Sequence, residues 1–169
     1  MQSATLKHPI SSHYIEDPYL PAMVIIGEER DSVHFIGYYR DDCGLIELQT
    51  ARDDETVCQV TVTACDWFEI RNGNLPIPEA AEDLLVAGKS RRIETNNLFI
   101  TIYDDGFDIC LTDKIPIRYV RSGDVILGVA ADGEVCRVLL ANLMATEVQH
   151  TKDLLQEDWN RRRADSSEA

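Results

Sequence analysis

The sequence has little positive charge and no long apolar run. Its 169 residues contain 16 Lys and Arg against 30 Asp and Glu, which gives a formal net charge of −14. Such an acidic chain repels polyanions, so we expect no direct binding to DNA, RNA or an anionic membrane. The longest apolar run near the start covers residues 22–26, and no later run reaches the ~20 residues of a spanning helix. We therefore expect neither an export signal nor a membrane segment.

Cysteine pairs are also lacking. The five cysteines are an odd number, are widely spaced and contain no C-x-x-C pair: Cys43, Cys58, Cys65, Cys110 and Cys136. Free thiols are typical of a reducing compartment, so the sequence predicts a cytoplasmic protein without disulfides.

Motifs that would indicate catalysis or a cofactor are missing. The chain has no glycine-rich phosphate loop, no nucleophile elbow and no Cys/His spacing for zinc, so we expect no cofactor and no motif-defined metal site. His34 alternates with Ile36 and Tyr38, which favours a packed, hydrogen-bonded histidine over a general base. Cys43 follows two aspartates that raise a thiol pKa, so it is a poor nucleophile candidate. These absences favour a non-catalytic protein.

The pattern that is present is a series of short β-type segments separated by turns. Alternating polar and apolar residues, punctuated by Asp-Gly and Asn-rich turns, predict strands. The candidate segments are 22–27, 32–39, 44–50, 56–71, 92–95, 98–103, 107–111, 115–120, 124–130 and 134–140. Asp66 interrupts the apolar face of the long segment 56–71. We interpret this as a bulge near residues 64–66 that returns Asp66 to solvent and buries Trp67, the alternative being a buried carboxylate.

Two segments have helical patterns. Residues 79–87 follow Pro78, carry acids early and end before Gly88, which predicts a short helix. Apolar residues at helical spacing predict a long C-terminal helix over about 142–162, followed by a frayed tail over 163–169. Its apolar stripe is expected to pack on the sheet, the alternative being that the turns around Trp159 dock to a partner.

Together these elements predict a mainly β (α+β) fold. We expect an antiparallel meander or open barrel of about eight or nine strands, with one short inserted helix and one long C-terminal helix covering a sheet face. Residues 1–21 are expected to form an irregular lead-in, and residues 22–160 one β-rich domain.

Negative charge is concentrated in the turns of the first part of the chain. Residues 16–55 contain 11 acids against three arginines. Alternate turns of a meander emerge at the same end of a sheet, about 10 Å apart, which would gather two of these turns and place Asp41 and Asp42 at the other end. The gathered candidates for partner binding are Glu28, Glu29, Asp31, Asp53, Asp54 and Glu55.

This arrangement predicts a small regulatory protein that binds a basic protein partner, as a nucleic-acid mimic or inhibitor. One alternative is a Ca²⁺-binding protein using the same carboxylates. Another is a small enzyme or ligand binder with a pocket in the β structure. A further interpretation is that the acidity serves solubility alone. No feature of the sequence indicates an oligomeric state.

Overall fold

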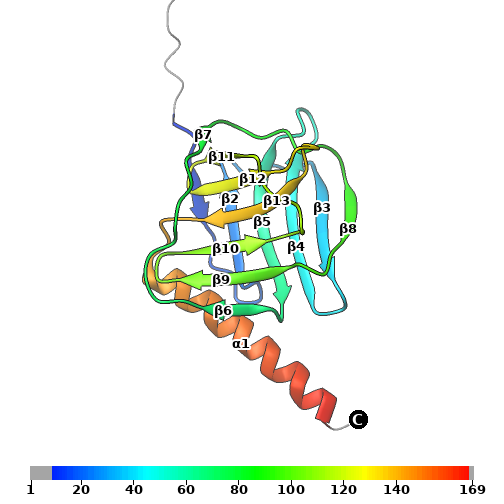
Figure 1. Ribbon diagram of the computed structural model, residues 1–169, viewed down its shortest axis with the longest axis vertical. Helices are drawn as coiled ribbons and strands as arrows, with labels where there is room; N and C mark the ends of the chain where they lie inside the picture. Colours follow the sequence, from blue (N-terminus) through cyan, green and yellow to red (C-terminus); the bar gives the residue numbers. More distant parts are fainter. Residues whose placement is uncertain (1–8, 168–169) are drawn as a thin grey trace, which may run out of the picture.

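The computed structural model describes residues 9–167, which form two β-sheets followed by one long helix (Figure 1). The mainly β class with a C-terminal helix is confirmed. The expected meander of eight or nine antiparallel strands is wrong, because the described residues form thirteen strands in two mixed sheets that do not close into a barrel.

The first sheet has six strands in the order β1-β2-β5-β4-β3-β8. Adjacent strands of this sheet run antiparallel, except β3 and β8, which run parallel to each other. The bounds are β1 (Ser12–Tyr14), β2 (Ala22–Ile26), β3 (Val33–Arg40), β4 (Gly44–Ala51), β5 (Val57–Cys65) and β8 (Arg91–Glu94).

The second sheet has seven strands in the order β6-β9-β10-β13-β12-β11-β7. Both edge strands, β6 and β7, run parallel to their neighbours. The bounds are β6 (Phe68–Ile70), β7 (Ala81–Glu82), β9 (Phe99–Tyr103), β10 (Gly106–Cys110), β11 (Arg118–Ser122), β12 (Val125–Val129) and β13 (Val135–Leu140).

The two sheets repeat one topology that the sequence did not reveal. In the first, β2 pairs with β5, not with its successor β3, which gives the order β2-β5-β4-β3. In the second, β10 likewise pairs with β13, which gives β10-β13-β12-β11. Each set is a Greek key, in which the first and fourth strands lie side by side. The meander prediction failed because β2 and β10 do not pair with the strands that follow them.

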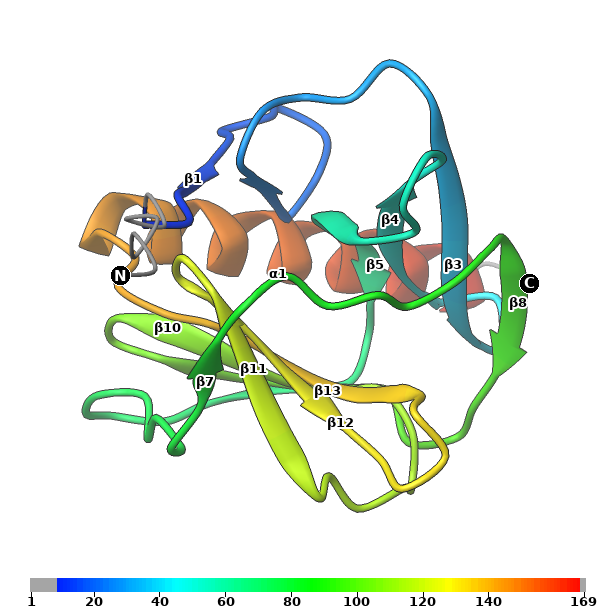
Figure 2. The same ribbon diagram turned by 90° about the horizontal axis from the view of Figure 1, so that it is seen from above.

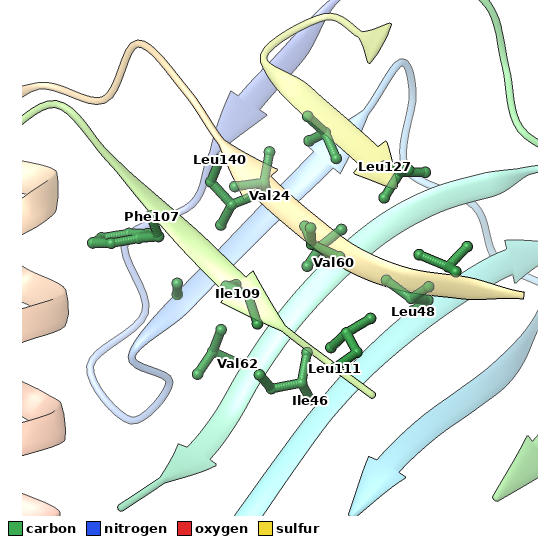
Figure 3. Close-up of a cluster of buried hydrophobic side chains, with 14 of the residues drawn as sticks. Val24, Ile46, Leu48, Val60, Val62, Phe107, Ile109, Leu111, Leu127 and Leu140 are labelled. Carbon is green, nitrogen blue, oxygen red and sulfur yellow. The ribbon is translucent and has the colours of Figure 1, made fainter. Parts of the chain in front are cut away.

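The core lies between the two sheets. Alternate residues of β2, β4 and β5 meet those of β10, β12 and β13, and Figure 3 shows these side chains pointing into the shared space. Because side chains alternate between the faces of a strand, each strand gives one set to this layer. A hydrogen bond also joins the two sheets across this core, in which the Tyr38 hydroxyl in β3 donates to the Val135 carbonyl in β13 at 2.7 Å.

The helix α1 (Ala145–Ser167) lies across one end of the two sheets (Figures 1 and 2). Its buried residues are Val148, Thr151 and Leu155, all in its first half, and the Thr151 hydroxyl donates to the Pro21 carbonyl at 2.6 Å. The second half extends beyond the strands in Figure 1. None of the described helical residues forms a segment long and apolar enough to cross a membrane.

Several predicted boundaries need correction. The C-terminal helix covers Ala145–Ser167 instead of 142–162, so residues 163–167 are helical and not frayed, while 168–169 lie outside the described residues. The lead-in contains β1, and its residues 1–8 lie outside the described part.

The predicted helix over residues 79–87 does not form. Instead β7 pairs with β11, and the Val57 N–H donates to the Leu85 carbonyl at 2.8 Å. These long-range backbone hydrogen bonds replace the local ones that a helix would make, so tertiary pairing overrides helix propensity here.

Candidate functional site

The two predicted acidic turns lie side by side at one end of the first sheet. One connects β2 to β3, and the other connects β4 to β5. The Arg52 N–H donates a 3.2 Å hydrogen bond to the Ser32 carbonyl, and the Arg30 guanidinium lies 3.9 Å from the Asp53 carboxylate. Because β3 and β4 are antiparallel, Asp41 and Asp42 lie at the opposite end. The structure therefore brings together the two loops that carry the six candidates, and we name these residues the acidic loop cluster: Glu28, Glu29, Asp31, Asp53, Asp54 and Glu55.

Local hydrogen bonds determine the shape of the second turn. An Asp54 carboxylate oxygen accepts from the Thr56 hydroxyl at 2.7 Å and from the Thr56 N–H at 3.0 Å. These hydrogen bonds lower the pKa of Asp54, so this carboxylate keeps its negative charge. Glu55 has a φ of 59°, in the left-handed region that non-glycine residues adopt when a turn requires it. Asp54 thus stabilises the turn in addition to contributing charge.

Two arginines reduce the negative charge of the site. Residues 28–31 and 52–55 contain six carboxylates and two guanidinium groups, a net charge of −4. The Arg30–Asp53 pair is exposed, at 45% and 72% of the two side chains, so solvent screens it strongly. The acidic loop cluster therefore contains an internal cation, Arg30, beside Asp53.

Apolar side chains lie beside the acidic loop cluster, which the sequence analysis did not anticipate. Leu84 and Val86 are 42% and 60% exposed. The strand-like pairing of Thr56 with Val86, and the Ala87 N–H donating to the Glu55 carbonyl at 3.0 Å, hold this segment against the second turn. This arrangement was missed because residues 79–87 were predicted to form a helix, whereas Val86 pairs with Thr56 in an extended segment.

A shallow hollow in the surface adjoins the two loops. Its volume is about 230 Å³, and its walls include Ile10, Ile26 and Leu84, with Glu28 and Arg30 also lining it. The site therefore combines apolar walls with a charged margin. Such a composition suits a protein partner better than a free ion.

Trp159 does not belong to this site. It lies in the second half of α1, half-buried, with the Arg163 guanidinium 4.6 Å from its ring centre. The acidic loop cluster is beside the start of β5, whereas α1 meets the other end of that strand through Arg162 and Asp66. Nine residues of strand span about 30 Å, so the two predicted docking sites are separate.

The prediction for Asp66 is wrong in one respect. Its side chain is 18% exposed and is not returned to solvent, because Arg162 donates to both carboxylate oxygens. This hydrogen bonding raises the pKa of Arg162. The carboxylate is therefore half-buried and paired with a cation from α1.

The surroundings of Asp66 follow the prediction more closely. A bulge does interrupt β5, but it lies at Thr63, since Ala64 pairs with Leu45 while Val62 pairs with Ile46. Trp67 packs against the core as expected. The Arg40 guanidinium stacks on the Trp67 ring, 3.9 Å from its centre.

The other sequence candidates have ordinary structural environments. The Nδ1 atom of His34 lies 3.5 Å from the Ser90 hydroxyl, and burial raises the pKa of the Cys43 thiol. All five cysteines are free. Over residues 9–167 no three His, Cys, Asp or Glu side chains converge in a group that could hold a metal ion, so the geometry gives no support to the Ca²⁺ alternative.

No protein-family model matches the chain, and a comparison with curated proteins finds no similar one.

Proposed function

We propose that the protein is a non-catalytic binding module that engages a basic protein partner through the acidic loop cluster. The observation that supports this most is the contact between the two loops that carry the six carboxylates, together with the exposed Leu84 and Val86 on the segment held against the second loop. Carboxylates speed the encounter with a basic surface, and apolar side chains give contact area once the partner is bound.

The partner's basic surface is one that also binds nucleic acid, which makes this protein a charge mimic or inhibitor. The net charge of −4 over the two loops, within a chain of −14, supports that form of the proposal. It implies that DNA or RNA competes with this protein for the partner and releases the partner from the complex. We place the complex in the cytoplasm, since three of the five free thiols are buried and unpaired, as suits a reducing compartment.

A small enzyme or ligand binder is a second candidate. It is favoured by a hollow of about 360 Å³ lined by polar side chains beside β8, including Asn96, Asp113 and Lys114. However, Lys114 already pairs with Asp132 at 2.6 Å and with Glu134 at 3.2 Å. In the binding proposal, by contrast, Glu28, Glu29 and Asp31 are exposed at the surface, so it is preferred.

A capture experiment with matched variants tests the proposal. The full chain is immobilised and exposed to lysate from its native source, beside the variants Glu28→Gln/Glu29→Gln and Asp41→Asn/Asp42→Asn. Both pairs remove two exposed charges, but at opposite ends of the first sheet. We expect basic proteins to be retained by the wild type and by the Asp41/Asp42 variant, and to be lost by the Glu28/Glu29 variant. Equal retention by both variants contradicts the proposal.

A further inference from the structure

The edge strand β8 is paired on one side. It is the last strand of the first sheet and, within the described part of the chain, pairs with β3 alone. Figures 1 and 2 both place it at the outer margin of the molecule, with no described segment beyond it. Three of its four residues are exposed, and Ile93 is half-buried. Its outer side is therefore open to another strand.

The register shows which backbone groups face outward. Ile93 pairs with Tyr38 in parallel, and the Thr95 N–H donates to the Tyr39 carbonyl at 2.8 Å. Alternate residues of a strand direct their N–H and C=O groups to the same side, so Ile93 faces β3 as Thr95 does. The N–H and C=O groups of Arg92 and Glu94 accordingly point away from the sheet.

The side chains of these two residues carry opposite charges. The Arg92 Nε donates to a Glu94 carboxylate oxygen at 2.7 Å, and the Arg92 guanidinium stacks over the Tyr39 ring at 3.8 Å. Both side chains are more than 60% exposed. Arg92 and Glu94 are each one residue away from Ile93, on opposite sides of it. A second β8 strand that runs in the opposite direction therefore places a Glu opposite each Arg.

We propose that β8 binds β8 of a second copy of this chain. The two strands run antiparallel about a twofold axis at Ile93, which places Arg92 opposite Glu94 of the second copy and Glu94 opposite its Arg92. These are hydrogen-bonded pairs in that register, because Arg92 and Glu94 are the residues whose backbone groups face outward. Opposite charges directly across two strands stabilise the pairing, and the same contacts occur twice.

Charge around the strand favours a second copy as the occupant. Arg92 and Glu94 meet opposite charges on a reversed copy of the same strand, whereas a strand with charges of one sign would leave one of them facing a like charge. The same register places Arg91 opposite Thr95, so no like charges face each other across the pair. Charged edge strands usually prevent pairing, but here the charges match their own reversed copy.

Two of the other edges have neighbouring segments beside them. Beside β1, the Ser12 hydroxyl accepts a 2.7 Å hydrogen bond from the Asp124 N–H, which holds another turn against that strand. Near β6, Asp66 is bonded to Arg162 of α1. A ribbon of two short strands buries well under the ~1,200 Å² of a standard stable interface, so the dimer is weak and depends on concentration.

Charge reversal in the full chain tests the proposal by analytical ultracentrifugation. We expect the wild type to show a reversible monomer–dimer equilibrium, and Arg92→Glu and Glu94→Arg each to weaken it by about tenfold or more. An equimolar mixture of the two variants regains association, because position 92 of each variant then faces the opposite charge at position 94 of the other. The double variant R92E/E94R also regains it.

Glu69 and Arg71 provide a matched control, since they form an exposed ion pair of 2.7 Å at β6 of the other sheet. Reversing each of them is expected to leave the equilibrium unchanged. The proposal is overturned by a monomeric wild type at every concentration, by single β8 variants that dimerise like the wild type, or by a mixture that stays monomeric. Circular dichroism spectra that match the wild type exclude misfolding as the cause of a loss.

Discussion

Arg30, in the loop between β2 and β3, has its guanidinium 3.9 Å from the carboxylate of Asp53 in the loop between β4 and β5. This cation joins loops that are far apart in the sequence and reduces the charge of the surface they form. Because both side chains are largely exposed, the pair contributes at most about 1 kcal/mol to stability. Its main effect is on the electrostatic potential of the acidic loop cluster.

The first prediction concerns this cation. Arg30→Gln makes the cluster more negative, so association with a lysine-rich peptide is expected to be a few-fold faster at low salt. The free energy of unfolding is expected to change by less than about 1 kcal/mol. Stopped-flow fluorescence measures the rate. Arg118→Gln, which removes the same charge from β11, is the control, and an equal increase for both variants contradicts the local role of Arg30.

The second prediction concerns the hydrogen bond between the sheets. Tyr38→Phe leaves the buried Val135 carbonyl without its 2.7 Å partner, so we expect a loss of about 1–3 kcal/mol in the free energy of unfolding. Urea unfolding followed by circular dichroism measures it. Tyr19→Phe is the control, since Tyr19 is 84% exposed and is expected to change stability little. If Tyr38→Phe leaves the free energy of unfolding unchanged, the hydroxyl does not stabilise the fold.

Local patterns were predicted better than long-range pairing. The segments 32–39 and 44–50 became β3 and β4, since alternation and a tight turn specify a hairpin locally. The pairing of β2 with β5 joins segments that are far apart in the chain, which no local pattern encodes. The Greek-key repeat and the extended segment around Leu85 were not predicted for the same reason, because the segments that pair in them are distant in the sequence.

The candidate site was predicted in part. The adjacency of the two acidic turns was predicted from the alternating direction of the strands. The assumed order of neighbouring strands was wrong, but both turns still emerge at the same end of the sheet. The pairing of Arg30 with Asp53 was not predictable, since it requires the positions of two flexible side chains. The exposure of Leu84 and Val86 was missed because helix propensity dominated that segment.

The third prediction concerns alkaline pH. Burial raises the pKa of the Cys65 thiol to about 12, from an ordinary value of 9.0. The unfolded chain therefore releases this proton first, so the stabilisation is complete below about pH 9 and is lost as the pH rises toward 12. We expect a fall of about 1 kcal/mol in unfolding free energy between about pH 9 and about pH 10, measured by urea titrations. Cys65→Ala is expected to remove this contribution, and an unchanged slope contradicts it.

The fourth prediction concerns the helix. Leu155 is fully buried, so Leu155→Ala is expected to cost about 2–5 kcal/mol in thermal or urea unfolding. Trp159 is half-buried beyond the core, so Trp159→Ala is expected to cost less than about 2 kcal/mol. Deletion of residues 150–169 removes Thr151 and Leu155 and is expected to abolish folding.

The alternative for Trp159 gives a different result. If its turn docks to a partner, Trp159→Ala reduces capture of that partner while the unfolding curve stays close to that of the wild type. A large loss of stability in Trp159→Ala, equal to that of Leu155→Ala, contradicts the assignment of the second half of α1 to the surface.

The salt dependence of partner binding tests the central claim most directly. The affinity of the full chain for its captured basic partner is measured by isothermal titration calorimetry at about 50 mM and about 500 mM salt, where screening shortens the range of electrostatic attraction. An acidic surface that attracts its partner predicts a loss of about tenfold or more in affinity at the higher concentration. An affinity that is unchanged across this range contradicts the account.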